Sequence, residues 1–159
     1  MSATAITREQ RNKLIKAAIQ AKEGSYSPYS KFRVGAALLS PNGTIIKGAN
    51  VENASYGGTI CAERTAIVKA VTEDMRTFTA LAVTTDVAST ISPCGICRQV
   101  LREFCALEMP VYLVAAGYDP SKPSEEGEGE EESDGKMVLE TTLGALLPHS
   151  FGPEDLPRA

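Results

Sequence analysis

Three cysteines and one glutamate limit how this chain can fold. Cys61 and Glu63 stand at the start of one predicted helix, and Cys94 and Cys97 stand at the start of another, 33 positions further along. Thiols bind Zn²⁺ at about 2.3 Å, so cysteines that share an ion require the two helix starts to meet. Three thiols would occupy three corners of a zinc tetrahedron and leave the fourth for water, as in catalytic sites. Glu63 is the candidate to move the protons of that water.

The spacing of these residues predicts the local structure around them. Cys94 and Cys97 are three residues apart and therefore share one face of a helix. Cys61 and Glu63 are two residues apart and would diverge inside a regular helix. We therefore expect Cys61 at the non-helical cap and Glu63 in the first turn, so that both side chains point to the place where the two helix N-termini meet.

The charge of such a site needs compensation. Three thiolates around Zn²⁺ sum to about −1, which makes a bound water less acidic than one at a site with neutral ligands. Two helix N-termini each offer about half a positive charge. Arg64 and Arg98 could also donate hydrogen bonds to the sulfurs from a second shell. We expect these features to restore the acidity of the water toward neutral pH.

A closed structural zinc site would need a fourth ligand, and the chain offers Cys105 and His149. Cys105 lies eleven residues past Cys94, about 16 Å along a helix axis, which is too far for a shared ion. We expect it to be an inert core thiol and His149, near the C-terminus, to lie on the surface. A dithiol redox motif is a second alternative interpretation of Cys94-Gly-Ile-Cys97, but it leaves Cys61 unused. A third alternative is that the cysteines are buried core residues placed there by chance.

The apolar pattern predicts an α/β fold, a three-layer α/β/α sandwich on a five-stranded mixed sheet. Thr7 and Gln10 form a capping-box pattern before the first helix. Pro41-Asn42-Gly43 predicts a hairpin, and the strand–helix–strand order from 80 to 115 predicts a parallel pair with a right-handed crossover. Strands are expected at 34–39, 44–49, 80–84, 111–115 and 137–140, and helices at 7–24, 61–71, 94–105 and 143–147.

Length and composition favour one globular domain over residues 1–159, with 43% hydrophobic and 23% charged residues. No apolar run approaches the roughly 20 residues needed to span a bilayer, and the first residues lack the pattern of a secretory signal. We therefore expect a cytoplasmic protein without a membrane partner, with the nucleus as a second location. In that environment four cysteines favour metal or thiol chemistry over disulfides.

The net charge of −4 hides a local concentration of acids. Seven acidic residues fall in the run 125–134, and we expect a solvated, mobile loop over 120–136. The rest of the chain carries 13 acids against 16 Lys and Arg, which is mild and scattered. Nucleic-acid binding needs a clustered basic face, so nucleic acid is not an expected partner. A partner-binding or regulatory role for the acidic run is the alternative.

The two cysteine segments resemble the three-cysteine form of the zinc nucleobase deaminase signature, in which Glu is the general acid/base. The chain is similar to the small, homotetrameric cytidine deaminases of the cytidine/deoxycytidylate deaminase family. This resemblance runs from the Tyr26-Ser-Pro-Tyr-Ser-Lys-Phe-Arg-Val-Gly segment to Leu147-Pro-His-Ser-Phe-Gly-Pro-Glu-Asp-Leu. The acidic run 125–134 departs from the compact family pattern.

The resemblance implies roles for individual residues. One zinc ion per subunit would be held by Cys61, Cys94 and Cys97, and Glu63 would pass protons from the attacking water to N3 of the pyrimidine and to the departing amine. The substrate would be a small-molecule nucleoside bound in sites shared between subunits. Phe32 would stack on the base, Asn50 and Glu52 would bond the ribose 3′-hydroxyl, and Ala54 and Tyr56 would lie near the 5′ end. The substrate-binding residues implied by the resemblance also include Ala62. Phe151 would cap the active site of a neighbouring subunit.

Simpler explanations exist for several of these residues. Phe32 flanks a predicted buried strand and could belong to the core, Glu52 could be a solvated loop acid, and Tyr56 and Phe151 could be packing residues. The substrate also remains open at this level. The sequence favours hydrolytic deamination of cytidine and 2′-deoxycytidine to the uridines, in pyrimidine salvage. The alternatives are another cytosine nucleoside, a cytosine in a polynucleotide, or a silent zinc- or RNA-binding module on the same fold.

Overall fold

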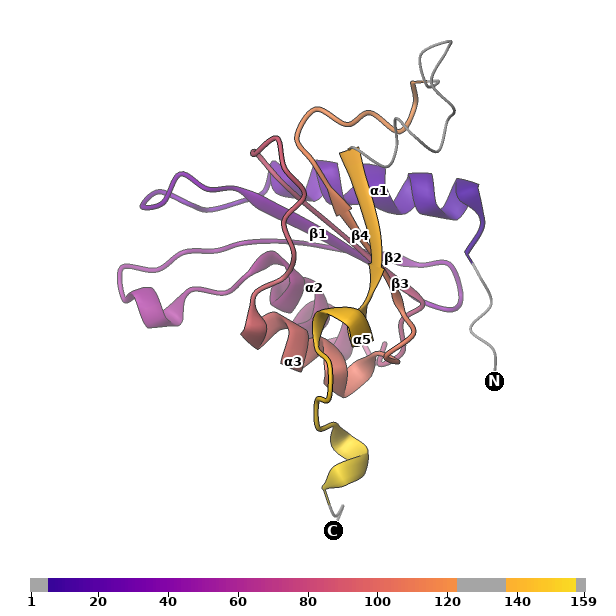
Figure 1. Ribbon diagram of the computed structural model, residues 1–159. Helices are drawn as coiled ribbons and strands as arrows, with labels where there is room; N and C mark the ends of the chain where they lie inside the picture. Colours follow the sequence, from indigo (N-terminus) through magenta and orange to yellow (C-terminus); the bar gives the residue numbers. More distant parts are fainter. Residues whose placement is uncertain (1–5, 123–136, 157–159) are drawn as a thin grey trace.

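The computed structural model describes residues 6–122 and 137–156. Figure 1 shows one twisted sheet with helices on both faces. The sheet order is β2-β1-β3-β4-β5, in which only the β3–β4 pair is parallel. The strands are β1 (Val34–Leu39), β2 (Ile45–Ala49), β3 (Ala80–Thr85), β4 (Pro110–Val114) and β5 (Val138–Thr142). The helices are α1 (Arg8–Lys22), α2 (Ala62–Thr72), α3 (Gly95–Phe104) and α5 (Leu143–Leu146), with short 3₁₀ turns η1 (Tyr56–Gly58) and η2 (Pro153–Asp155).

Two apolar layers lie on opposite faces of the sheet. Helix α1 covers one face, where Leu14 and Ala18 pack against Ala37 and Ala82 of the central strands. Helices α2, α3 and α5 cover the other face (Figure 1), and their apolar side chains pack on the alternate residues of the same strands. Alternation along each strand sends neighbouring residues to opposite sides. The predicted α/β/α sandwich on a mixed sheet is therefore confirmed.

Local sequence signals account for most of the element ends. Thr7 and Gln10 form a reciprocal capping box at the start of α1. Gly43 takes a φ of +87° in the hairpin between β1 and β2. Strand β5 ends two residues later than predicted, because Thr142 still pairs with Pro110 of β4 while its hydroxyl caps α5. The acidic run 125–134 lies outside the described residues. Among the described residues, no helix has the length and apolar character to cross a membrane.

Two glycines let helices approach the sheet closely. A Cβ built on Gly48 of β2 would lie 2.3 Å from the carbonyl oxygen of Ala62 and 2.5 Å from the amide of Ala66. A Cβ on Gly35 of β1 would lie 2.2 Å from the carbonyl oxygen of Ala18 in α1. Real Cβ atoms do not approach backbone this closely. The first turn of α2, which carries the predicted site residues, therefore rests directly on the backbone of β2.

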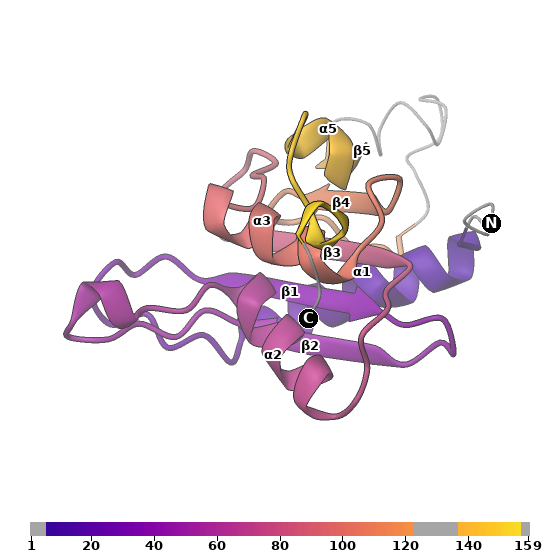
Figure 2. The same cartoon turned by 90° about the horizontal axis from the view of Figure 1, so that it is seen from below.

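A long arm extends from one end of the sheet (Figure 2). It consists of residues 25–33, before β1, and residues 50–61, between β2 and α2. The two segments are joined by backbone hydrogen bonds, including Tyr26 N–H to Asn50 C=O at 2.9 Å and Glu52 N–H to Tyr26 C=O at 2.8 Å. Val51 and Ile60 exchange two further bonds at 2.9 and 3.0 Å. The polar stretch that follows β2 is therefore held as paired, extended backbone rather than as an isolated loop.

One carboxylate ties three elements together at the base of this arm. Asp86, just after β3, accepts from the buried Lys22 of α1 at 2.9 Å and from the Arg33 guanidinium at 2.7 and 3.0 Å. The Lys22 ammonium also donates to the carbonyl of Thr85 at 3.1 Å. These bonds from Arg33 and Lys22 lower the pKa of Asp86 from 3.8 to about 2. The same contacts hold Arg33, and with it the entry into β1, against the end of β3.

Asp86→Asn should lower the free energy of unfolding by about 1 kcal/mol near neutral pH. The shift from 3.8 to about 2 corresponds to at most about 2.4 kcal/mol, and we discount it because 35% of the side chain is exposed. A lowered native pKa means that this stabilisation is present above the unfolded value of 3.8 and is lost as the pH falls toward 2. Urea unfolding at about pH 7 and about pH 3 measures the difference.

The matched control is Asp74→Asn, because Asp74 is 94% exposed and lies 3.6 Å from Arg76. We expect it to change the free energy of unfolding by less than about 0.5 kcal/mol. Equal losses for the Asp86 variant at both pH values would contradict the electrostatic account.

Candidate metal centre

Three thiols from two helix starts lie together on the α2–α3 face of the sheet. Cys61 is the N-cap of α2 with extended dihedral angles, and Cys94 is the N-cap of α3. Their sulfurs are 3.8 Å apart, and the sulfurs of Cys61, Cys94 and Cys97 all lie within 4.8 Å of one another. Two sulfurs bonded at 2.3 Å to one tetrahedral zinc would be separated by about 3.8 Å. The geometry of the three thiols therefore fits a shared zinc ion.

Electrostatics within the cluster also favour a cation. The hydrogen bond from the Cys97 thiol, followed by donation from Arg64, lowers the pKa of Cys61 to about 5. The same contact with Cys61, together with burial, raises the pKa of Cys97. One sulfur therefore ionises readily while its neighbour resists ionisation. A divalent cation bound among the sulfurs would stabilise all three thiolates at once, since metal binding displaces thiol protons.

The other candidate ligands lie apart from this cluster. Cys105 is the C-cap residue of α3, at the opposite end of that helix from Cys94. It is 4% exposed, and burial raises its pKa to about 12, as expected for a core thiol. His149 is exposed, with a φ of 54°. Within residues 6–122 and 137–156, the group able to hold a metal consists of Cys61, Cys94 and Cys97.

The two arginines behave differently. The guanidinium of Arg64 lies 3.5 Å from the sulfur of Cys61 and 3.3 Å from the carbonyl of Thr59. Arg98 was expected to donate to a sulfur as well, and that prediction is wrong. Its three side-chain nitrogens donate to the Pro93 carbonyl at 2.7 Å, the Ser92 hydroxyl at 2.7 Å and the Leu146 carbonyl at 2.8 Å. Backbone carbonyls are better acceptors than sulfur, so Arg98 instead joins the segment before Cys94 to the end of α5.

Glu63 lies in the first turn of α2, two residues after Cys61, and is 4% exposed. Burial is the main cause that raises its pKa above the usual 4.5, and the negative charge of Cys61 acts in the same direction. A carboxyl group whose pKa is raised keeps its proton to a higher pH than an ordinary glutamate does. Glu63 therefore has the environment of a general acid/base.

A cavity of about 410 Å³ opens beside this carboxyl group and the thiols. Its size is in the range of small-molecule sites. Each extended segment contributes alternate residues to the wall, because alternate side chains of an extended chain share one face. The described residues that line it include no Lys or Arg. They are Ser30, Phe32, Val34, Asn50, Glu52, Thr59, Cys61, Glu63, Val83, Thr85, Ile91, Ser92 and Cys94.

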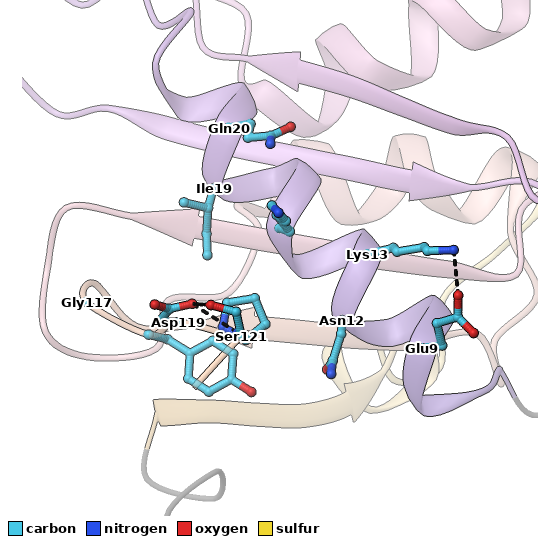
Figure 3. Close-up of a pocket in the computed structure, with 11 residues that line it drawn as sticks. Glu9, Asn12, Lys13, Ile19, Gln20, Gly117, Asp119 and Ser121 are labelled. Atoms are coloured by element: carbon cyan, nitrogen blue, oxygen red, sulfur yellow. Dashed lines mark hydrogen bonds and ion pairs between the residues drawn. The ribbon is translucent and has the colours of Figure 1, made fainter. Parts of the chain in front are cut away.

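A larger cavity of about 610 Å³ lies on the opposite face of the sheet, between α1 and residues 117–121 (Figure 3). Its charged groups are largely paired with one another. Lys13 contacts Glu9 at 2.7 Å, and Asp119 accepts from the amide and hydroxyl of Ser121 at 3.0 and 2.6 Å. None of its lining residues is a cysteine or histidine. The smaller cavity, beside the thiols and Glu63, is therefore the candidate active site.

Most of the chain matches a known family. The profile described as "Cytidine and deoxycytidylate deaminase zinc-binding region" matches residues 8–113. This chain belongs to the cytidine and deoxycytidylate deaminase family. The cytidine deaminase of Sporosarcina psychrophila is 48% identical over 147 residues, which cover 92% of this chain and 95% of that protein. The probable cytidine deaminase of Dictyostelium discoideum is 48% identical over 152 residues, 95% of this chain and 90% of that protein.

A solved structure supports the same assignment. The crystal structure of cytidine deaminase from Burkholderia pseudomallei superimposes with a TM-score of 0.72 at 39% identity, covering 92% of this chain and all of that one. The match extends beyond the cysteine segments to the whole sheet and its helices. The predicted family, fold class and zinc cofactor are therefore confirmed, and the protein is a zinc-dependent deaminase.

The family's expected substrate contacts divide into two groups in this structure. Phe32, Asn50 and Glu52 line the cavity beside Glu63. Tyr56 instead lines an adjoining cavity of about 250 Å³, which it shares with Glu52. The remaining expected residues do not line the active-site cavity of this copy. Ala62 is fully buried at the start of α2, Ala54 is exposed on the arm, and Phe151 is exposed on the C-terminal segment.

Two polar residues of the deaminase cavity, Asn50 and Glu52, are already hydrogen-bonded within the chain. Asn50 Oδ1 accepts from the Val34 amide at 2.9 Å and the Ser25 hydroxyl at 2.5 Å, while Nδ2 donates to the Phe32 carbonyl at 2.8 Å. One N–H of the Asn50 amide is thus left for a ligand. Glu52 accepts from the amides of Tyr29 and Ser30 at 2.9 and 3.2 Å and from the Ser30 hydroxyl. Ser30, Thr59 and Ile91 were not predicted as wall residues. Ser30 and Thr59 could have been found from their two-residue spacing from Phe32 and Cys61. Ile91 could have been found from its place just before the Cys94 segment.

Cys94→Ser should remove most of the zinc from the purified protein, because serine does not supply a thiolate and two thiols hold the ion poorly. Elemental analysis should show a fall from about one zinc per chain to a small fraction. The control is Cys105→Ala, which truncates the thiol at the far end of α3 and should keep the zinc. Loss of zinc from the Cys105 variant with retention in the Cys94 variant would overturn the assignment of ligands.

Proposed function

We propose that this chain catalyses the hydrolysis of cytidine and 2′-deoxycytidine to uridine and 2′-deoxyuridine, with release of ammonia. The observation that carries the proposal is the position of Glu63, a buried carboxyl group with a raised pKa, at the junction of the three thiols and the neutral cavity. Free nucleosides would be returned to the pyrimidine pool by such a reaction. We place this salvage function in the cytoplasm, where free thiols persist.

Residues of this chain account for the proton transfers. Zinc held by Cys61, Cys94 and Cys97 would supply Lewis acidity, which lowers the pKa of a water molecule. Glu63 accepts a proton from the attacking water and delivers it to N3 of the base. It then takes the remaining proton of the new C4 hydroxyl group and passes it to the departing amine. The C4–O bond forms and the C4–N bond breaks, so water is consumed and ammonia is released. Because Glu63 is buried, its proton is exchanged with the substrate rather than with bulk water.

The wall of the cavity suits a nucleoside. We propose that Phe32 stacks on the pyrimidine, that the free N–H of Asn50 and the carboxylate of Glu52 bond the 3′-hydroxyl, and that Ala62 contributes at the base end. Glu52 and Glu63 are the acidic groups of the described lining, which includes no Lys or Arg. A phosphate group would meet carboxylates without a compensating cation. These features support a free nucleoside over a nucleotide or a polynucleotide.

We also propose that the protein works as a homotetramer with sites shared between subunits. Several large side chains are exposed in the single chain, including Tyr56 of the arm at 74% and Phe151 of the C-terminal segment at 61%. The rings of Tyr29 and Tyr56 pack at a centroid distance of 5.7 Å. Exposed apolar side chains that lie together mark surfaces that bind a partner. Ala54 and Tyr56 would lie near the 5′ end of the ribose, and Phe151 would cover a neighbouring subunit's site.

Glu63→Gln should lower kcat for cytidine by about 10²- to 10⁴-fold, because glutamine cannot relay the protons that the reaction needs. Ammonia release from purified protein measures this loss. Zinc content is determined on the same sample, since the three thiols are unchanged. Retained activity with full zinc occupancy would remove Glu63 from the mechanism. A wild-type protein with bound zinc but no turnover would instead favour a silent zinc- or RNA-binding module.

Glu52→Gln should impair nucleosides that carry a 3′-hydroxyl far more than those that lack it. A charged hydrogen bond contributes about 1.5–3 kcal/mol, so kcat/KM for cytidine should fall by about 10-fold or more. The value for 3′-deoxycytidine should change little. The control is Ser30→Ala, which removes one donor to Glu52 but keeps the carboxylate. It should affect both substrates by similar factors. Equal losses for both substrates in the Glu52 variant would exclude the proposed contact.

A further inference from the structure

The C-terminal segment is fastened to α3 by a buried arginine. Arg102 lies in the last turn of α3, and its side chain is 9% exposed. Its guanidinium forms an ion pair with Glu154 of η2, 52 positions further along the chain. Figure 1 shows this segment leaving α5, crossing α3 and projecting beyond it. An ion pair of this kind ties the end of the chain to the helix that begins at the zinc ligand Cys94.

Gly152 completes the contact. A Cβ built at this position would lie 2.4 Å from Cζ of Arg102 and 2.4 and 2.5 Å from its two terminal nitrogens. The backbone of the segment therefore lies directly on the guanidinium plane, which no other residue type would allow without displacement. Gly152 N–H also donates to the Asp155 carboxylate at 2.8 Å, which closes the short turn η2. The three residues Arg102, Gly152 and Glu154 form what we call the C-terminal clamp.

The clamp holds the backbone that directly follows an exposed aromatic residue. Phe151 precedes Gly152, and its carbonyl accepts from the side chain of Gln99 at 3.3 Å. Phe151 is nevertheless 61% exposed. The backbone of Phe151 is thus held on α3 while its side chain contributes little to the core of its own chain. This arrangement fits a residue whose partner lies outside the chain.

The buried guanidinium of Arg102 lowers the stability of the fold more than a purely structural contact would require. Nε of Arg102 is buried without a hydrogen-bond partner among the described residues. A buried cation that is incompletely bonded costs free energy, and an apolar residue at such a site is often no less stable. A planar guanidinium does offer a flat, rigid surface with directed donors, on which a glycine backbone can rest in one orientation.

We propose that Arg102 is a positioning residue for the deamination reaction. Through Gly152 and Glu154 it holds the segment so that Phe151 is already directed toward the active-site cavity of a neighbouring copy of this chain. The inference rests on the proposed function, in which Phe151 covers that site. Fixing the segment before the substrate arrives removes an ordering cost from binding. Loss of the clamp should therefore raise KM and leave the chemical step at Glu63 nearly unchanged.

The first experiment breaks the ion pair at its exposed end, which avoids truncation in the core. Glu154 has a side chain that is 59% exposed. Glu154→Ala should raise KM for cytidine by about threefold to tenfold, the size expected for the ordering of a short segment, with kcat within about twofold. Glu154→Gln keeps an acceptor for Arg102 and should recover part of the loss. Zinc content and molecular mass in solution are measured on each variant.

A double-mutant cycle separates positioning from general stabilisation. Phe151→Ala should itself raise KM, and Glu154→Ala should cause no further rise in that background. If the two losses in KM multiply instead, the clamp does not act through Phe151 and the proposal is overturned. If Phe151→Ala leaves KM unchanged while wild-type turnover and the Glu63 dependence hold, the shared-site assignment fails and the reaction assignment survives.

A second pair of variants tests the contact itself. Gly152→Ala should raise KM in the wild-type background, because the new methyl group meets the guanidinium. In the Arg102→Ala background the same substitution should be tolerated, because the obstructing group is gone. Gly57→Ala is the control, since a Cβ there meets nothing within 4 Å. A Gly152→Ala effect of equal size with and without Arg102 would show that the clamp geometry is irrelevant.

Discussion

The close approach of two helix N-termini is the constraint on which the rest of the structure depends. The sulfurs of Cys61 and Cys94 lie 3.8 Å apart although the residues are separated by 33 positions. The parallel pairing of β3 and β4 places α3 beside α2 on the same face of the sheet. Gly48 then lets the first turn of α2 rest directly on β2. A zinc site with three thiol ligands needs sub-ångström placement, and here backbone contacts supply it.

The meeting of the two helix N-termini also explains how one cluster holds a carboxyl group with a raised pKa and a thiol with a lowered pKa. Burial raises the pKa of Glu63, whereas hydrogen bonds from Cys97 and Arg64 lower that of Cys61 to about 5. The carboxyl group and the thiolate stand two residues apart, so a shared environment would shift both in one direction. The N-cap position separates them: it leaves Cys61 half-exposed beside Arg64, while the first turn carries Glu63 into the interior. A proton carrier and an anionic ligand can therefore coexist at one helix start.

Periodicity and turn chemistry were sufficient to predict the fold, because each element carries its own local signal. The apolar alternation of β1 and the capping box of α1 are examples. The spacing of the cysteines was also sufficient to predict their positions at the helix starts. The hydrogen-bond partners of side chains could not be predicted from the sequence. Arg98 binds carbonyls and a hydroxyl rather than a sulfur, because the choice depends on which acceptors the folded chain brings near, and Leu146 is 48 positions away. The clamp on Arg102 was not foreseen for the same reason.

The internal bonds of Asn50 and Glu52 bear on how such a cavity can be both rigid and selective. Asn50 uses its oxygen twice and one N–H inside the chain, which fixes the orientation of the amide and leaves one N–H without a partner among the described residues, in a residue that lines the cavity. Glu52 is held by the Tyr29–Ser30 turn, so its carboxylate need not be ordered by a ligand. Both residues thus form most of their hydrogen bonds within the chain before substrate binds. The remaining N–H of Asn50 and the remaining acceptor sites of Glu52 are held in fixed positions, which favours one hydroxyl position over a general affinity for polar groups.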